Sequence, residues 1–146
     1  MNIVTCIDLS DSTDQVVAKA QHLATALKAK LWILHVAEPE PDFVGFQAGP
    51  QSVRDTYSEE FHKEHRQIQE IAERLRKNGL DSTALLIQGP IAETLMSNAV
   101  KIQADYIVVG SHGKSALKQA LVGSVSESII RHAERPVLVV PTREQS

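Results

Sequence analysis

The chain has 146 residues, of which 42% are hydrophobic and 23% charged, and its formal net charge is -3. This length suits a single domain, residues 1–146, that can bury a hydrophobic core. The slightly negative charge argues against nucleic acid or an anionic membrane as the partner. No apolar run approaches the roughly 20 residues that a membrane helix needs, so we expect no membrane insertion.

The opening "MNIVTCIDLS" has neither the basic start nor the small-residue cleavage site of a signal peptide. Cys6 is the single cysteine, which excludes an internal disulfide and fits a reducing compartment. We therefore expect a cytoplasmic protein. Because Cys6 lies within an apolar run, we interpret it as a buried structural thiol rather than a nucleophile.

Short apolar runs alternate with segments of helical periodicity along the whole chain. The runs predict strands at residues 2–7, 31–36, 82–88, 105–110 and 136–141. The periodic segments predict helices at residues 13–29, about 57–77, 91–103 and about 124–133. Strands joined by such long connections run parallel, with right-handed crossovers. The sequence therefore predicts an α/β fold, an open five-stranded parallel sheet with helices on both faces.

Local signals refine the ends of these elements. Asn78-Gly79 is a C-terminal cap for the second helix, and Pro90 lies near the first position of the third. Ser12 with Gln15 forms a capping-box pattern. The segment 38–52 is rich in proline and glycine and is predicted to be a mobile loop. Its Phe43 and Phe46 cover a site, contact a partner or pack onto the domain.

The stretch "VVGSHGKSALKQALVGSVSES", residues 108–128, is the strongest functional signal. Its "GKS" is not a phosphate-binding P-loop, because Val108 stands where that motif needs glycine. With strand order 3-2-1-4-5, the first strand would end at Asp8 and the fourth at Gly110, on either side of the point where ligands bind in open α/β sheets. Further on, "SVSE" opens a helix as a capping box, and the free amides of a first helical turn attract anions. A capped helix after a surface loop is the alternative reading.

The spacing G-x2-G-x9-G-S in this stretch resembles the nucleotide motif of the universal stress protein family. The segments "NIVTCIDLSDS", "LWILHVAEP", "GPIAETL" and "YIVVGSHGKSALKQALVGSVSESIIRHAERPVLVVP" resemble the same family, so that the likeness covers the whole chain. The resemblance implies a Rossmann-like fold of the adenine nucleotide alpha hydrolase type with the 3-2-1-4-5 order. It also places the chain with the family members that bind ATP.

The resemblance further implies which residues contact the nucleotide. Asp8 and Val36 would contact adenine or ribose, although Asp8 could instead cap the first helix. The residues implied for ribose and phosphates are Gly110, His112, Gly113, Gly123, Ser124, Val125 and Ser126. Magnesium would bridge the phosphates, but no carboxylate in the loop serves as its ligand. We predict no protein metal site, since His62 and His65 lie on a charged helix face.

No general base or nucleophile stands out, and one histidine in the motif, His112, is not a mechanism by itself. We therefore predict no catalytic residues and expect a regulatory, stress-response ATP-binding protein with at most slow hydrolysis. A nucleotide hydrolase or transferase and a nucleotide-free dimeric scaffold are the alternatives. The apolar strand 136–141 invites pairing at a sheet edge, and the resemblance implies a homodimer through it. The sequence identifies no regulatory protein partner.

Overall fold

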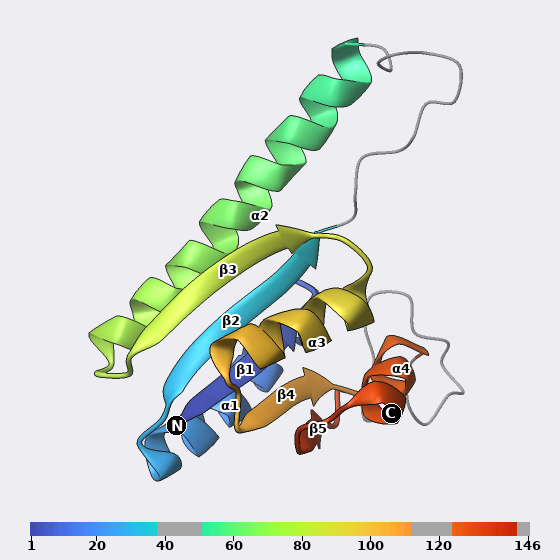
Figure 1. Cartoon of the computed structure of the whole chain (residues 1–146). Coiled ribbons are helices and arrows are strands. Elements are labelled where there is room, and N and C mark those ends of the chain that lie inside the picture. Colours follow the sequence, from blue (N-terminus) through green and yellow to red (C-terminus); the bar gives the residue numbers. More distant parts are fainter. Residues whose placement is uncertain (38–50, 112–123, 143–146) are drawn as a thin grey trace.

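The computed structural model describes residues 1–37, 51–111 and 124–142, with the backbone alone at 51–54 and 124. Five strands in these ranges form one parallel sheet in the order β3-β2-β1-β4-β5 (Figure 1). They are β1 (Asn2–Ile7), β2 (Lys30–Ala37), β3 (Ser82–Gln88), β4 (Tyr106–Gly110) and β5 (Val137–Val140). The predicted strands and their order are confirmed.

Helices cover both faces of this sheet, as predicted. They are α1 (Thr13–Leu27), α2 (Gln51–Lys77), α3 (Ile91–Ile102) and α4 (Ser124–His132). The helices α1 and α2 pack on the face that carries Ile3 and Ile33, whereas α3 and α4 pack on the face that carries Val4 and Leu34. Successive residues of a strand point to opposite faces, so the continuously apolar strands supply both cores at once.

The start of α2 differs from the prediction. The helix begins at Gln51, whereas the sequence predicted a loop over 38–52 and a helix from about residue 57. The last proline of that segment is Pro50, and no proline or glycine after it interrupts a helix before Gly79. The rest of the expected loop, with Phe43 and Phe46, lies outside the described residues. The amino-terminal half of α2 extends past the carboxyl end of β3 (Figure 1).

Two of the predicted caps have different outcomes, while the side chain of Ser124, which would form a third, lies outside the described atoms. After α2, Gly79 adopts a φ of 87° and the amide of Leu80 donates to the carbonyl of Leu75 at 3.1 Å, which confirms the Asn78-Gly79 cap. The capping box at Ser12 is wrong: its side chain makes no capping hydrogen bond to the start of α1. Ser12 has helical backbone angles instead of the extended ones that such a cap uses, and its hydroxyl lies 2.9 Å from that of Ser10.

Candidate nucleotide site

The carboxyl ends of β1, β2 and β4 lie side by side at the centre of the sheet. Ile7 is paired with His35 of β2, and Thr5 is paired with Val108 of β4. Continuing the second register by two residues brings Ile7 level with Gly110. After β1, the chain adds β2 and β3 on one side of β1, and it later adds β4 and β5 on the other side. The strand order therefore reverses between β1 and β4, where open α/β sheets bind ligands.

Asp8 follows β1 directly at this point. Its Oδ1 accepts hydrogen bonds from the amide of Ser10 at 3.0 Å and from the Ser10 hydroxyl at 2.6 Å. Leu9 between them has a φ of 58°, an unusual value for a residue with a branched side chain. The other carboxylate oxygen of Asp8, Oδ2, is buried and has no hydrogen-bond partner in the described part of the chain. Asp8 therefore holds, at the switch point, one acceptor that no described residue uses.

Hydrogen bonds with α4 and with the end of β5 hold the end of β4 in place. Gly110 is its last residue, and the carbonyl oxygen of Gly110 accepts a 2.6 Å hydrogen bond from the hydroxyl of Ser126 in α4. The amide of Ser111 donates to the carbonyl of Val140 at 2.8 Å, and the Ser111 hydroxyl accepts from the amide of Thr142 at 3.0 Å. Sequence reasoning did not single out Ser111. Its only signal was a polar residue directly after a buried strand.

The structure describes some of the other implied nucleotide residues but not all of them. Val36 is a buried residue of β2 and packs with the α3–α4 core, beside the end of β1. Ser124 is the first residue of α4, and Val125 after it is exposed. Ser126 is 5% exposed, and its hydroxyl is engaged with Gly110. His112, Gly113 and Gly123 lie outside the described residues.

Cys6 lies two residues before Asp8 on β1 and is partly buried. Burial first and the negative charge of Asp8 second raise the pKa of the Cys6 thiol to about 12. A thiol with such a pKa is protonated at neutral pH, which makes it a poor nucleophile. This agrees with a structural role for Cys6.

One buried contact near the site was missed by the sequence reasoning. His35 is 5% exposed at the carboxyl end of β2, and its Nδ1 lies 2.8 Å from the carbonyl oxygen of Ile7. Its Nε2 lies 3.2 Å from Oε2 of Glu64 in α2. The signal available was the position of Glu64 on the same helical stripe as the buried residues Ile68 and Ala72.

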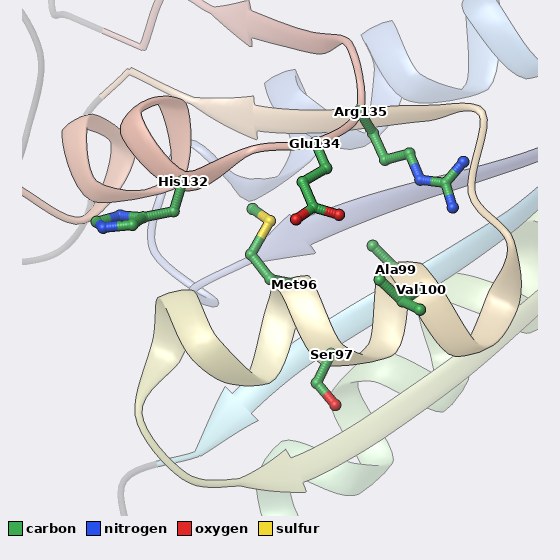
Figure 2. A pocket seen from close by; sticks show the side chains of 7 residues that line it. All are labelled: Met96, Ser97, Ala99, Val100, His132, Glu134 and Arg135. Carbon is green, nitrogen blue, oxygen red and sulfur yellow. The ribbon is translucent and has the colours of Figure 1, made fainter.

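A separate cavity of about 190 Å³ lies between α3 and the connection from α4 to β5 (Figure 2). In Figure 2 the carboxylate of Glu134 points toward α3 and Met96, while the guanidinium of Arg135 points away from them. The cavity is lined by Met96, Ser97, Ala99, Val100, His132, Glu134 and Arg135. None of the predicted nucleotide residues lines it, so this cavity is not the predicted site.

The described residues contain neither a metal-binding cluster nor a membrane-spanning helix. Within residues 1–37, 51–111 and 124–142, no three histidine, cysteine or carboxylate side chains come together to hold a metal ion. His62 and His65 are both exposed on α2. No helix in the described ranges combines the length and apolar character required to cross a membrane.

A five-stranded parallel sheet in this order, with helices on both faces and Asp8 at its switch point, defines an α/β protein of Rossmann-like architecture. The sequence model of the Universal stress protein family matches residues 1–141, so the chain belongs to that family. A universal stress protein of Thermus aquaticus, named for the region 3' of a QAH/OAS sulfhydrylase, is 33% identical over 144 residues. That match covers 94% of this chain and 96% of the relative.

Solved structures agree with this assignment. The structure of MJ0577, a protein of Methanocaldococcus jannaschii, superposes with a TM-score of 0.83 at 25% identity, covering 99% of this chain and 97% of that one. A universal stress protein solved in complex with cAMP gives a TM-score of 0.68 at 26% identity and covers 97% of both chains. The fold and the family predicted from the sequence are therefore confirmed.

Proposed function

We propose that the chain is an ATP-binding regulatory module of the stress-response type, with at most slow hydrolysis. The observation that carries the proposal is Oδ2 of Asp8, a buried acceptor without a donor among the described residues. Buried polar atoms are normally hydrogen-bonded, and the amino group of adenine or a ribose hydroxyl would supply the missing donor. The related protein in complex with cAMP supports an adenine nucleotide as the ligand.

The start of α4 would receive the phosphates. The first amides of a helix lack partners within it and lie at the positive end of its dipole, which suits an anion. Ser126 ties this end to Gly110, so α4 begins close to the end of β4. In this proposal Ser124, Val125 and Ser126 contribute amides, while the Ser126 hydroxyl stays on Gly110. The proposed site also includes His112, Gly113 and Gly123, for which the sequence motif is the only support.

Magnesium would accompany ATP through the phosphate oxygens. Mg²⁺ commonly keeps several waters and binds through substrate phosphates rather than in an all-protein cage. No residue of the chain is assigned as a magnesium ligand.

Calorimetric titration with ATP and magnesium tests the site directly. We expect the Gly113→Val/Gly123→Val double variant to lose at least about tenfold in affinity, because two side chains would fill the space that backbone and phosphate need. Circular dichroism must show that the variant keeps the fold. Equal affinity in the wild type and the variant would remove the binding site from the proposal.

Two further experiments test whether the protein hydrolyses ATP and whether it acts as a scaffold without nucleotide. In the described part of the site the one carboxylate, Asp8, is already bonded to Ser10, so we assign it to binding rather than to the activation of water. A single-turnover assay with magnesium should release phosphate slowly; rapid release would favour the hydrolase or transferase alternative. Mass spectrometry of the purified protein should find adenine nucleotide, whereas a scaffold that never binds nucleotide would carry none and would not bind it in the titration.

A homodimer through residues 136–141 belongs to the same proposal, as does a cytoplasmic location. Because β5 ends the strand order, one side of it has no partner strand among the described residues. Leu138 of β5 and Ile130 of α4 are both exposed apolar side chains. Unpaired edges and exposed apolar residues favour association with a second copy of the chain.

A further inference from the structure

His35 joins three elements beside the candidate nucleotide site. It lies on β2, its Nδ1 is 2.8 Å from the carbonyl oxygen of Ile7 on β1, and its Nε2 is 3.2 Å from Oε2 of Glu64 on α2. The side chains of His35 and Glu64 are 7% and 15% exposed, so water screens the contact little. Ile7 immediately precedes Asp8, the residue with the unused buried acceptor.

The chemistry of the two contacts fixes where hydrogens must be. A carbonyl oxygen only accepts, so Nδ1 of His35 must carry the hydrogen that faces Ile7. In a neutral imidazole, Nε2 then has no hydrogen and is a buried nitrogen without a hydrogen-bond partner. An ionised carboxylate is also only an acceptor, and two acceptors 3.2 Å apart repel each other. A second proton, carried on Nε2, would turn this repulsion into an attraction between an imidazolium and a carboxylate, an ion pair at 3.2 Å.

We propose that His35 and Glu64 share this proton and together position the end of β1 for nucleotide binding. The inference rests on the proposed function, because the site it serves is the ATP site. With the proton present, α2 is tied through Glu64 and His35 to the peptide that carries Asp8. When the proton is lost, the tie to α2 weakens and Asp8 is held less firmly. His35 is thus a positioning residue and does not itself touch the nucleotide.

The surroundings of the pair contain few competing charges. The residues that pair with His35 in the sheet, Ile7 on β1 and Leu86 on β3, do not titrate. The carboxylates placed nearby are Glu64, in contact, Asp8, one residue beyond Ile7, and the exposed Glu60, one turn before Glu64 on α2. The buried face of α1 carries Thr13, Val16, Val17, Ala20 and Ala24, and the fully buried side chains of α2 are Ile68, Ala72 and Leu75.

A substitution of Glu64 can keep the contact with His35 while removing its need for a second proton. The amide of Glu64→Gln can donate to the bare Nε2 of a neutral imidazole, so the link survives without a second proton. His35→Asn keeps a donor near the position of Nδ1 but is too short to reach Glu64. His35→Gln has the opposite property, since its amide reaches toward Glu64 but not toward Ile7. Glu70→Gln, exposed on the same helix and not on the turn next to Glu64, is the matched control.

The first experiment is ATP titration of the wild type and these variants from about pH 5 to about pH 8, where histidine changes charge. We expect wild-type affinity to fall by about fivefold to tenfold as the pH rises, because the buried attraction between His35 and Glu64 is lost with the proton. Glu64→Gln should flatten this profile, and Glu70→Gln should leave it unchanged. The inference fails if Glu64→Gln keeps the wild-type profile or if the wild-type profile is flat.

The two His35 variants test separately the contact with Ile7 and the contact with Glu64. His35→Asn should retain more ATP affinity than His35→Gln, because the hydrogen bond to Ile7 acts directly on the end of β1. Stability is measured alongside by thermal unfolding without nucleotide. If both variants bind ATP as tightly as the wild type, His35 positions nothing in the site and the inference is wrong.

Nitrogen-15 NMR of the histidine rings tests the shared proton without nucleotide. We expect His35 to carry hydrogens on both nitrogens at the acid end of the range, and its doubly protonated fraction at each pH to be smaller in Glu64→Gln. A ring with hydrogen on Nε2 alone would overturn the inference even if ATP binds. If the wild type binds no ATP, the proposed function and the positioning role both fail, while the NMR result still decides whether the proton is shared.

Discussion

The hydroxyl of Ser126 in α4 donates a 2.6 Å hydrogen bond to the carbonyl oxygen of Gly110, the last residue of β4. Sixteen positions separate the two residues, so this bond closes the long connection that carries most of the glycine motif. It fixes the start of α4 against the sheet end that the sequence identified as the phosphate site. The motif therefore has a structural component that the resemblance did not describe.

Ser126→Ala should weaken both stability and nucleotide binding. The substitution leaves the Gly110 carbonyl without its donor, which costs about 1–3 kcal/mol in the free energy of unfolding. ATP affinity should fall as well, because the first turn of α4 is no longer held at the end of β4. Urea denaturation and calorimetry measure the two effects. Ser97→Ala, at an exposed position of α3, is the control and should change neither; an unaltered Ser126→Ala protein would contradict the role given to this bond.

Gly89, between β3 and α3, is predicted to tolerate no side chain. Its φ is 150°, and a Cβ there would lie 2.6 Å from Oγ1 of Thr94. Gly89→Ala therefore adds a clash to backbone strain, and we expect it to lower the free energy of unfolding by about 2–4 kcal/mol. Gly79→Ala is a matched control, because Gly79 has a φ of 87° and nothing within 4 Å of the added Cβ.

A double variant separates the two costs at Gly89. Gly89→Ala/Thr94→Ala removes the threonine hydroxyl, so part of the loss should be recovered while the cost of the backbone angle stays. Chemical denaturation of the two single variants and the double variant gives the unfolding free energies for a double-mutant cycle. Additive effects of the two substitutions would show that a clash between the added Cβ and Thr94 plays no part.

Sequence reasoning was most successful where one physical signal dominates. Both faces of β1, β2 and β4 are buried, so these strands appear as continuous apolar runs that need no knowledge of the tertiary structure. The long connections between them then fix a parallel sheet. The strand order needed more: it followed from the family resemblance and from the position of the glycine motif.

The errors arose where a competing local turn or a tertiary contact decides the structure. The pattern at Ser12 fits a capping box, but Asp8 and Ser10 form a turn of their own and Ser12 takes helical angles. Nothing in the sequence pairs His35 with Glu64, because the contact depends on how α2 crosses the sheet. Glu64 does lie on a stripe with Ile68 and Ala72, and a charged residue on a buried stripe indicates a partner.

Cys6 predicts a loss of stability in alkaline solution. Burial, and after it the charge of Asp8, raise the pKa of Cys6 from the usual 9.0 to about 12. Because the folded protein holds this proton more tightly than the unfolded chain, the contribution to stability is complete below pH 9.0 and is lost as the pH rises to about 12. The unfolding free energy of Cys6→Ala should therefore fall less steeply over that interval than that of the wild type. Parallel slopes in the two proteins would contradict the raised pKa.

The same pKa predicts slow modification of Cys6. The thiolate is the reactive form, and at neutral pH a rise from 9.0 to 12, three factors of ten, leaves about a thousandth of the usual thiolate population. Reaction with a chromogenic disulfide should be correspondingly slow in native protein and ordinary in denaturant. Asp8→Asn removes the smaller cause of the shift, so the native rate should rise modestly; a native rate equal to that of the denatured chain would rule out this environment.

The edge strand β5 offers the clearest test of assembly. Leu138 is 43% exposed there, whereas Val139 next to it packs with the α3–α4 core, so a charge at Leu138 tests association without disrupting that core. We expect Leu138→Glu to convert a dimer into a monomer, because a like charge from each copy would meet across the proposed two-fold interface. Light scattering measures the mass, and circular dichroism reports the fold.

Tyr57→Glu is the matched control for this substitution. Tyr57 is 37% exposed and lies in the amino-terminal half of α2, so the variant also places a charge where an exposed large side chain stood. The helix α2 lies far from β5 at this end (Figure 1). It should remain dimeric. Two results would refute pairing through β5: a wild type that is monomeric at every concentration, or a Leu138→Glu protein with the same dimer mass as Tyr57→Glu. A monomeric Leu138→Glu protein that still binds ATP would show in addition that each copy carries a complete nucleotide site.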